Sequence, residues 1–452
     1  MRSHLASRSA PARKHFASLD DWLAWQESLH VREIDLGLER VRSVAERLTL
    51  SVPQYPVISV AGTNGKGSSI ALLVSILAAA GYRVGAYTSP HLRRYNERVQ
   101  IGGRSVSDKR LCTAFERVEH ARGDTPLTYF EFGTLAALEV FGDADLDIGI
   151  LEVGLGGRLD AVNLVDPDVA LITTIAIDHV AWLGGDRESI GREKAGIFRP
   201  GRPAVYAEPD PAVSVIDAAA GMQTKLQLYG RDFQYQLDGK VWHWSRVGNA
   251  AEPQRYDSLP RPRLNGDCQI QNAAGVLAVL DTLRDRFFVS DGAIRLGLSR
   301  VFLSGRFEIV AGPVEHVLDV AHNAQAAKAL ARQLDALQPA ARTYAVVGML
   351  MDKDAVAVLT PLASKVDRWF VGGVKSARGA APAELAEVVR RVAPRVPVSS
   401  YQEIVTASQA AKRCAAPGDR IVVFGSFLSV GAVLKGIQPL ADQHEELSWT
   451  NN

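Results

Sequence analysis

Short apolar runs alternate with helical patterns through the first part of the chain. The apolar runs occupy residues 57–61, 84–88, 147–153 and 169–175. Continuous runs of this length are typical of parallel strands whose two faces are both buried. Between them, helical patterns begin at Ser68 and cover residues 131–141. Because strand, helix and strand in succession form a βαβ unit, we expect a parallel sheet with helices on both faces.

The pattern changes between about Tyr206 and Arg263, where aromatic and polar residues alternate around glycine turns. Such alternation predicts a small antiparallel insertion. A helical pattern returns at residues 270–283, and a second alternating series follows Ser304 and Gly305. In that series, strands separated by helices are expected at residues 316–320, 343–347, 368–371 and 420–424.

These patterns predict an α/β protein with two domains, which its 452 residues also favour. Residues 1–300 are expected to form a parallel-sheet domain with the antiparallel insertion. Residues 301–452 are expected to form a Rossmann-like α/β domain. The first 17 residues carry several basic side chains and no apolar signal core. We expect a disordered tail there, and a transit peptide is the alternative.

Composition excludes several classes of partner. The 51 basic and 50 acidic residues nearly balance, so the chain has no electrostatic footprint for nucleic acid or an anionic membrane. Its most apolar stretch, residues 70–80, is too short to span a bilayer. Cys112, Cys268 and Cys414 are far apart, which favours neither a disulfide framework nor a cysteine metal site. A cytoplasmic protein is expected.

The stretch "AGTNGKGSS", residues 61–69, joins the first strand to its helix. Glycines here would free the backbone N–H groups to face an anion, and Lys66 would reach its phosphates. The alternative is a merely tight turn, but Thr63, Asn64 and Lys66 among the glycines argue against it. The spacing departs from the common loop, because Gly67 separates Lys66 from Ser68. We therefore expect a phosphate loop in which Ser68 is not the metal ligand, and residues 1–300 are expected to be a parallel-sheet domain of the P-loop ATPase type.

Other polar residues follow strands of the same predicted sheet. Ser89, Glu152 and His179 each lie at or just beyond the carboxyl end of a strand, where open α/β sheets bind ligands. Ser89 and Glu152 offer oxygen ligands for Mg²⁺. Taken singly, Ser89 could mark a turn, Glu152 a helix cap and His179 a structural histidine. Lys194, with acidic neighbours, reads on its own as a solvated helix residue. Residues 154–163, with three glycines and no periodicity, read as an active-site loop.

With these residues in place, several longer motifs resemble one family. They include "VAGTNGKGS", "YTSPHL", "LTYFEFGTLAAL", "LEVGLGGRLDAVN", "DRESIGREKAGI", "SGRFE", "DVAHN" and "VGMLMDKD". Together they resemble the bacterial dihydrofolate synthase/folylpolyglutamate synthase family of the Mur-ligase superfamily, over nearly the whole chain. "LTYFE" and "LGGRLDA" are specific to its folate branch. Ala181 and Ala324 depart from the family pattern, but neither touches a proposed metal or phosphate ligand.

The resemblance implies a full set of site residues. ATP would contact Thr63, Asn64, Gly65, Lys66, Gly67, Ser68, Asn272, Arg306 and Asp319. Two Mg²⁺ ions would be held by Ser89, Glu152, His179 and Lys194, the last as a carbamate. The pterin or folate would lie against Ile34, Asp35, Leu36, Thr128, Tyr129, Phe130, Glu131, Leu159, Asp160 and Ala161. Glutamate would contact His322 and Ser426, and Lys66, Lys194 and His322 would be catalytic.

The resemblance also implies an activity. The chain would be a monomeric, ATP-dependent ligase that adds L-glutamate to dihydropteroate and to reduced folates through an acyl phosphate. Alternatives are a Mur-type ligase acting on another carboxylate, a small-molecule kinase or ATPase, and a non-enzymatic nucleotide switch. Only about 60 residues precede the phosphate loop, fewer than the extra domain of a cell-wall Mur ligase needs. Metal ligands spread over several strand ends disfavour the switch.

Overall fold

The computed structural model describes residues 14–247 and 254–437. Its first sheet has the strand order β4-β3-β2-β5-β1-β6-β7-β8. These strands are β1 (Val57–Ala61), β2 (Val84–Tyr87), β3 (Val99–Ile101), β4 (Arg104–Ser105), β5 (Ile148–Glu152), β6 (Val169–Ile172), β7 (Pro203–Tyr206) and β8 (Lys225–Leu228). The predicted parallel sheet is confirmed, except that β3 and β4 pair antiparallel at one edge.

Alternate residues of the central strand β1 enter different hydrophobic clusters, which explains why four of its five residues are apolar. Ile58 and Val60 pack with α3 (Lys66–Ala79), α9 (Cys268–Thr282) and α10 (Asp291–Arg300). Val57 and Ala61 lie in the cluster on the other face. The helices of that second face are α2 (Glu39–Arg47), α4 (Asp108–Arg122), α5 (Tyr129–Gly142), α7 (Arg187–Ala195) and α8 (Val213–Gly221), with α1 (Leu19–Gln26) packed outside them.

The predicted antiparallel insertion is present but shorter than expected. It consists of β9 (Phe233–Asp238), β10 (Val241–Arg246) and β11 (Arg255–Pro260), in the order β11-β10-β9. Trp244 of this sheet is buried and donates a hydrogen bond from Nε1 to Ala274 O of α9, 3.1 Å away. Residues 206–228 do not belong to the insertion, because β8 pairs with β7 in the first sheet and α8 connects these two strands. The half-buried face of β8 hid this strand from the sequence pattern.

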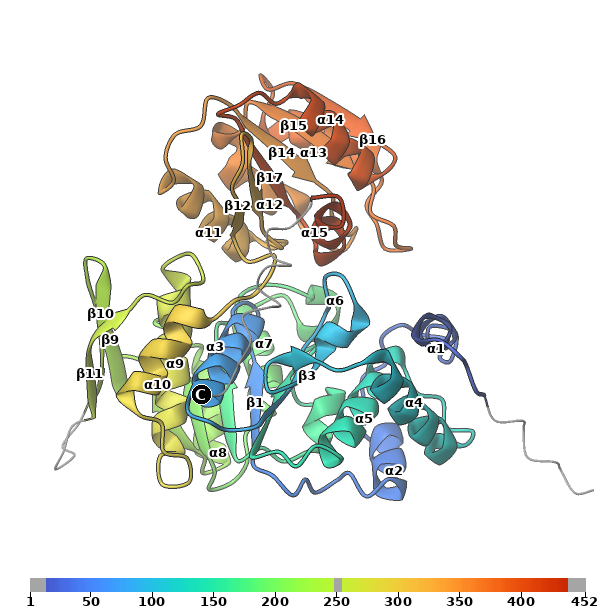
Figure 1. Ribbon diagram of the computed structural model, residues 1–452, viewed down its shortest axis with the longest axis vertical. Helices are drawn as coiled ribbons and strands as arrows, with labels where there is room; N and C mark the ends of the chain where they lie inside the picture. The colour runs from blue at the N-terminus through green and yellow to red at the C-terminus, as the bar shows by residue number, and fades with distance from the viewer. Residues whose placement is uncertain (1–13, 248–253, 438–452) are drawn as a thin grey trace, which may run out of the picture.

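The second sheet has the order β12-β13-β17-β14-β15-β16 and forms the separate upper body in Figure 1. Its strands are β12 (Glu308–Val310), β13 (Glu315–Leu318), β14 (Thr343–Val347), β15 (Arg368–Gly372), β16 (Val398–Tyr401) and β17 (Arg420–Phe424). All pairings are parallel except that of β12 with β13. The Rossmann-like prediction is thus confirmed.

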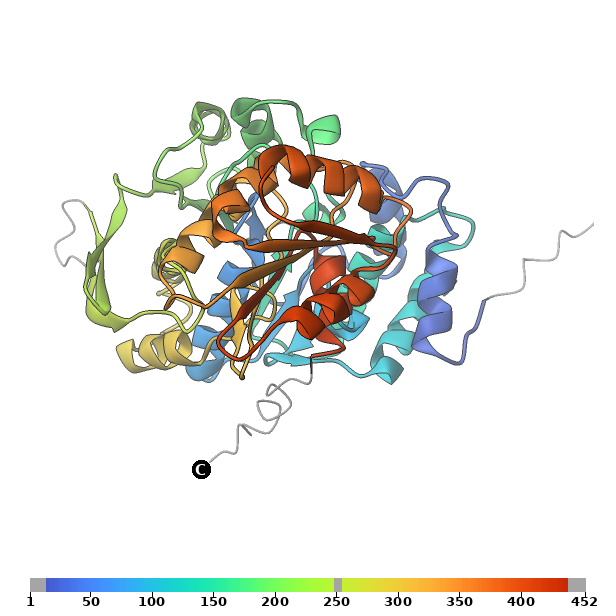
Figure 2. The same ribbon diagram turned by 90° about the horizontal axis from the view of Figure 1, so that it is seen from above.

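Helices cover both faces of this second sheet, as the view from above shows (Figure 2). They are α11 (Ala324–Asp335), α12 (Ala355–Leu359), α13 (Pro382–Val392), α14 (Ile404–Cys414) and α15 (Phe427–Leu434). No helix in the parts of the chain that the structure describes is long and apolar enough to cross a membrane.

The predicted disordered tail lies largely outside the described residues, which begin at Lys14. Phe16, within the predicted tail, is described and packs on the rings of Trp22 and Trp25, with centroids 5.0 and 5.5 Å away.

Candidate active site

The phosphate loop joins β1 to α3, and two of its glycines have no room for a side chain. Gly62 and Gly65 have φ values of 149° and 90°. A Cβ on Gly62 would lie 1.8 Å from Thr173 Oγ1, and one on Gly65 would lie 2.5 Å from Asn272 Oδ1. The loop therefore depends on glycine at both positions. Asn272, predicted to contact ATP, indeed packs directly against the loop.

Lys66, at the first position of α3, folds back over the loop. Its Nζ donates to the carbonyl oxygens of Gly62 and Thr63 at 3.0 and 3.4 Å. Burial lowers the pKa of this ammonium. The loop is also tied to the segment after β6, since Thr63 N donates to Thr174 O at 2.7 Å. Lys66 is thus held at the carboxyl edge of the sheet, where the anion is expected.

A cavity of about 340 Å³ lies at this edge and is lined by both domains. From the first domain it is lined by residues 62–67, Ser89, Pro90, Glu152, residues 154–156, Asp178, His179, Leu183 and Lys194. From the second domain it is lined by Arg306, His322, Leu350, Lys353, Arg378 and residues 425–428. The structure therefore brings the predicted phosphate, metal and glutamate residues together. Ser68 is buried in the first turn of α3.

The predicted metal ligands have chemistry that fits a magnesium ion. Glu152 is 4% exposed, and its Oε2 accepts a hydrogen bond from Ser89 N at 3.0 Å. Burial raises the pKa of this carboxyl, so a nearby cation would stabilise its ionised form. Burial lowers the pKa of His179 to about 4, which leaves the neutral imidazole that metals bind. The described residues contain no group of three His, Cys, Asp or Glu side chains that could hold a metal ion by itself, so Ser89 and a modified Lys194 would have to complete the set.

Lys194 is not the solvated helix residue that its local sequence indicates. It is 4% exposed, and its Nζ donates to Gly62 O at 3.1 Å. Burial, followed by the charge of Lys66, lowers the pKa of Lys194 to about 7. Its acidic neighbours face elsewhere, since Glu193 pairs with Arg158 and Glu188 caps the start of α8. The amine therefore points into the cavity.

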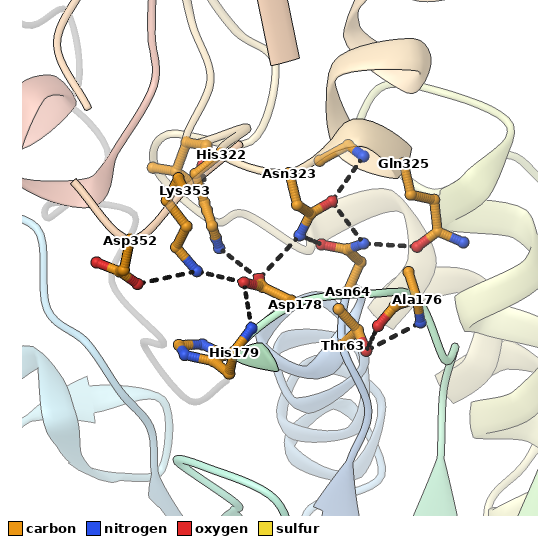
Figure 3. Close-up of polar contacts among 12 residues, drawn as sticks. Thr63, Asn64, Ala176, Asp178, His179, His322, Asn323, Gln325, Asp352 and Lys353 are labelled. Carbon is orange, nitrogen blue, oxygen red and sulfur yellow. Dashed lines mark hydrogen bonds and ion pairs between the residues drawn. The ribbon is translucent and has the colours of Figure 1, made fainter. Parts of the chain in front are cut away.

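Asp178 connects the two domains and was not among the predicted site residues. Its carboxylate pairs with Lys353, lies 3.4 Å from His322 Nε2 and accepts from Asn323 Nδ2 at 3.3 Å (Figure 3). Burial alone would raise its pKa, but the hydrogen bond from His322 and the charges of His179 and Lys353 lower it. Its position directly before His179 was the available sequence signal.

A second contact between the domains starts from the phosphate loop itself. Asn64 Nδ2 donates to Asn323 Oδ1 at 3.2 Å and to Gln325 Oε1 at 2.5 Å (Figure 3). Asn323 returns a hydrogen bond from its Nδ2 to Asn64 Oδ1 at 3.0 Å. The loop predicted to hold phosphates is therefore bonded to the start of α11 in the second domain.

The two residues of the second domain predicted to contact ATP are placed differently. Arg306 lines the cavity, and a Cβ on Gly67 would lie 3.9 Å from its Nη2. Asp319 is half-buried and accepts from the N–H groups of Phe307 and Ala321, both at 2.8 Å. Asp319 thus holds the turn that follows Arg306, and its contact with ATP stays a prediction.

The predicted pterin residues form a neighbouring group. Thr128 and Glu131 make the capping box of α5, and Arg40 links Glu131 to Asp35. Phe130 packs against Gly154, since a Cβ there would lie 2.7 Å from its ring. Ile34, Leu36, Tyr129 and Leu159 are half-buried, and Ala161 is buried at the start of a short 3₁₀ helix, η2 (Ala161–Leu164).

Asp160 has a structural role in this group that its sequence did not reveal. It accepts from the N–H groups of Leu155 and Val162 at 2.8 and 3.0 Å. Burial raises its pKa to about 7. The carboxylate thereby holds the predicted active-site loop of residues 154–163 in one conformation.

Both predicted glutamate-binding residues line the cavity. His322 is oriented by its Nδ1, 2.8 Å from Val320 O, so that Nε2 faces Asp178. Ser426 caps α15, and its Oγ accepts from Ser429 N at 3.0 Å. Lys353, which the sequence motif contained but the prediction passed over, lies beside them at 6% side-chain exposure.

Comparison with known proteins finds matches over most of the chain. Residues 60–280 match the Mur ligase middle domain, and residues 305–427 match the Mur ligase glutamate ligase domain. The chain is 44% identical to the dihydrofolate synthase/folylpolyglutamate synthase of Escherichia coli (strain K12), over 93% of this chain and 95% of that one. It is 39% identical to the Haemophilus influenzae protein of the same description, over 92% of this chain and 97% of that one.

Solved structures show the same similarity. E. coli FolC in complex with DHPP and ADP superposes with a TM-score of 0.87 at 44% identity, covering 95% of this chain and 99% of that chain. A bifunctional folylpolyglutamate synthase/dihydrofolate synthase with Mn, AMPPNP and L-glutamate bound gives a TM-score of 0.85 at 44% identity, covering 95% and 100%.

Proposed function

The chain belongs to the dihydrofolate synthase/folylpolyglutamate synthase family of the Mur ligases, and on this premise we propose that its cavity joins L-glutamate to dihydropteroate and to reduced folates. It is an ATP-dependent ligase that adds glutamate. One observation carries the assignment to this cavity: a phosphate loop and predicted metal ligands from one domain face His322, Lys353 and Ser426 from the other.

The chain uses a nucleotide and a divalent metal, as the complexes of its relatives indicate. We assign the metal to Ser89, Glu152, His179 and a carbamylated Lys194, and we propose two Mg²⁺ ions. When bound, such ions neutralise charge on the phosphates of ATP. The neutral imidazole of His179 and the buried carboxylate of Glu152 suit that role.

The chemical problem is that a carboxylate is a poor electrophile. Transfer of the γ-phosphoryl group of ATP to the substrate carboxylate gives an acyl phosphate and ADP. The amino group of glutamate then attacks the acyl carbon, the bond to the phosphate oxygen breaks, and an amide, inorganic phosphate and a proton result. Lys66 and the loop N–H groups stabilise charge on the transferred group. His322 and Ser426 hold the attacking glutamate.

The proposed division of labour follows the two bodies of the fold. We place the domain boundary near residue 300, with the ATP-binding domain before it and the glutamate-ligase domain after it. The pterin would lie against the group formed by residues 34–36, 128–131 and 159–161. Contacts such as Asn64 with Asn323 close the cavity and exclude water from the acyl phosphate. A monomeric, cytoplasmic enzyme remains our expectation.

The test is to measure the mass of products formed from ATP, glutamate and either dihydropteroate or tetrahydrofolate. A gain of one glutamyl unit on each substrate is expected, with larger products from tetrahydrofolate. ADP formation without any glutamyl product would instead indicate a kinase or ATPase. If neither substrate is glutamylated but another carboxylate is, the chain would be a Mur-type ligase of other specificity.

A further inference from the structure

Arg378 is a cation of the cavity whose acidic partners are both exposed. Its Nη1 lies 3.3 Å from Glu33 Oε1 and its Nη2 lies 2.9 Å from Asp352 Oδ1. The side chains of Glu33 and Asp352 are 69% and 38% exposed. Exposed ion pairs are weak because water screens them. A substrate carboxylate can therefore replace either partner.

The other cations lining the cavity are held by groups of a different kind. Lys353 is paired with the buried Asp178. Lys66 and Lys194 both donate to the carbonyl oxygen of Gly62 in the phosphate loop. Arg306 lies over the ring of Phe427, 5.2 Å from its centroid. Among the described lining residues, Arg378 is thus the cation best placed to exchange one carboxylate for another.

Arg378 also lies between the two substrate sites proposed above. Glu33 directly precedes residues 34–36, which belong to the proposed folate site. Asp352 directly precedes Lys353, which reaches Asp178 beside His322 (Figure 3). The guanidinium therefore connects a loop of the folate site to a loop of the glutamate site.

The two classes of substrate differ in the charge they bring to this place. Dihydropteroate carries one carboxylate, the one that reacts. A folate that already bears glutamate carries a second, the α-carboxylate, three carbons from the reacting γ-carboxylate. Planar guanidinium groups bind carboxylates through two parallel hydrogen bonds.

We propose that Arg378 binds the α-carboxylate of the last glutamyl residue of a folate substrate, and that Glu33 competes for the same guanidinium. This inference rests on the proposed function and makes Arg378 a specificity residue between the two reactions. Dihydropteroate leaves the ion pair between Arg378 and Glu33 intact, whereas a glutamylated folate replaces Glu33.

The experiment compares KM and kcat for dihydropteroate and for tetrahydrofolate bearing one glutamate. In Arg378→Ala, KM for the folate should rise roughly tenfold or more relative to KM for dihydropteroate, because a charge-assisted contact is lost. In Glu33→Gln, KM for the folate should fall, because the competitor is gone. Arg390→Ala is the matched control, since Arg390 forms an exposed pair with Glu387 on α13.

The two variants distinguish binding of the substrate carboxylate from a purely structural contact between the domains. If the ion pair between Arg378 and Glu33 only holds the domains together, both variants raise KM for both substrates, and the inference is wrong. If Arg378→Ala changes KM equally for the two substrates, the inference is also wrong. The proposed function would still stand in that case, provided that the unaltered enzyme glutamylates both substrates. A chain that glutamylates neither substrate overturns the proposed function itself.

Discussion

Lys66 and Lys194 donate to the same acceptor, the carbonyl oxygen of Gly62, at 3.0 and 3.1 Å. Two ammonium groups so close together repel each other, and Lys194 is buried while Lys66 is half-buried. Burial and this repulsion lower the pKa of Lys194 to about 7, whereas an unperturbed lysine stays protonated until pH 10 or so. Carbamylation would make the side chain of Lys194 anionic, so that it attracts the ammonium group of Lys66 instead of repelling it.

We therefore expect carbon dioxide to modify Lys194 reversibly. The neutral amine is the reactive form, and its fraction rises as the pH increases through about 7. Carbon-13 NMR of protein equilibrated with labelled bicarbonate should show a carbamate signal that is stronger at pH 8 than at pH 6. The signal should disappear in Lys194→Ala. A signal of equal strength in that variant would place the modification elsewhere.

Lys66 is expected to matter for rate more than for folding. Replacing it by alanine removes a positive charge from the expected position of the transferred phosphoryl group, so kcat/KM should fall on the order of a hundredfold or more. Steady-state kinetics measures the loss, and circular dichroism checks the fold. Lys109→Ala, on the exposed side of α4, is the control and should keep its activity. Unchanged turnover in Lys66→Ala would contradict the assignment of the loop.

Helix α3, which begins at the phosphate loop, is positioned by its close crossing with α10. Gly297 of α10 has no room for a side chain, since a Cβ there would lie 2.5 Å from the Cα of Ile76 in α3. Ser75 Oγ donates to Gly297 O at 2.8 Å across the same crossing. A change in α10 therefore acts on the helix that presents its N-terminus to the phosphates.

Gly297→Ala should destabilise the protein by about 1–3 kcal/mol, because the two helices must separate to fit the methyl group. Gly292→Ala is a matched control in the same helix, where the nearest atom to an added Cβ is 3.9 Å away. That change should be neutral or stabilising by up to about 1 kcal/mol through helix propensity. Urea unfolding monitored by circular dichroism measures both. Equal effects of the two changes would show that the crossing is looser than the structure indicates.

The elements that the sequence predicted best are those buried on both faces. β1, β14 and β17 were predicted to the residue, because each is a mainly apolar strand whose residues are almost all buried. The edge strands β12 and β16 were missed, since their residues are mostly half-buried and show no clear apolar pattern. The apolar pattern of a strand reflects how far it is buried. Edge strands are less buried, so their pattern is weaker.

The site was predictable where it follows strand ends and hidden where it depends on the packing of the two domains. The phosphate loop, Ser89, Glu152 and His179 share one sheet edge, as the rule for open sheets requires. Asp178 and Lys353 are separated by 175 positions in the sequence. No local pattern indicates that pairing, because it exists only when the second domain lies on the first.

The closed arrangement depends on a buried ion pair that bridges the domains. Asp178 and Lys353 are 7% and 6% exposed in their side chains. Removing one member of such a pair leaves a buried unpaired charge, at about 3–5 kcal/mol. The chain can avoid this penalty by opening, since opening returns Lys353 to water without unfolding either domain. If the closed form alone carries this penalty of about 3–5 kcal/mol, the ratio of closed to open molecules falls by roughly two orders of magnitude or more.

Asp178→Asn should therefore open the molecule, raising its radius of gyration in small-angle X-ray scattering and lowering kcat/KM for both dihydropteroate and tetrahydrofolate by roughly a hundredfold. Adding Lys353→Met removes the stranded charge, so the double variant should regain the compact radius but not the activity, because the charges of Asp178 and Lys353 are gone from the cavity. Asp210→Asn is the control, since Asp210 is 89% exposed and pairs with Arg187 within the first domain. If Asp178→Asn keeps its radius but unfolds at lower urea concentration, Lys353 is buried within its own domain, and the pair stabilises the fold rather than closure.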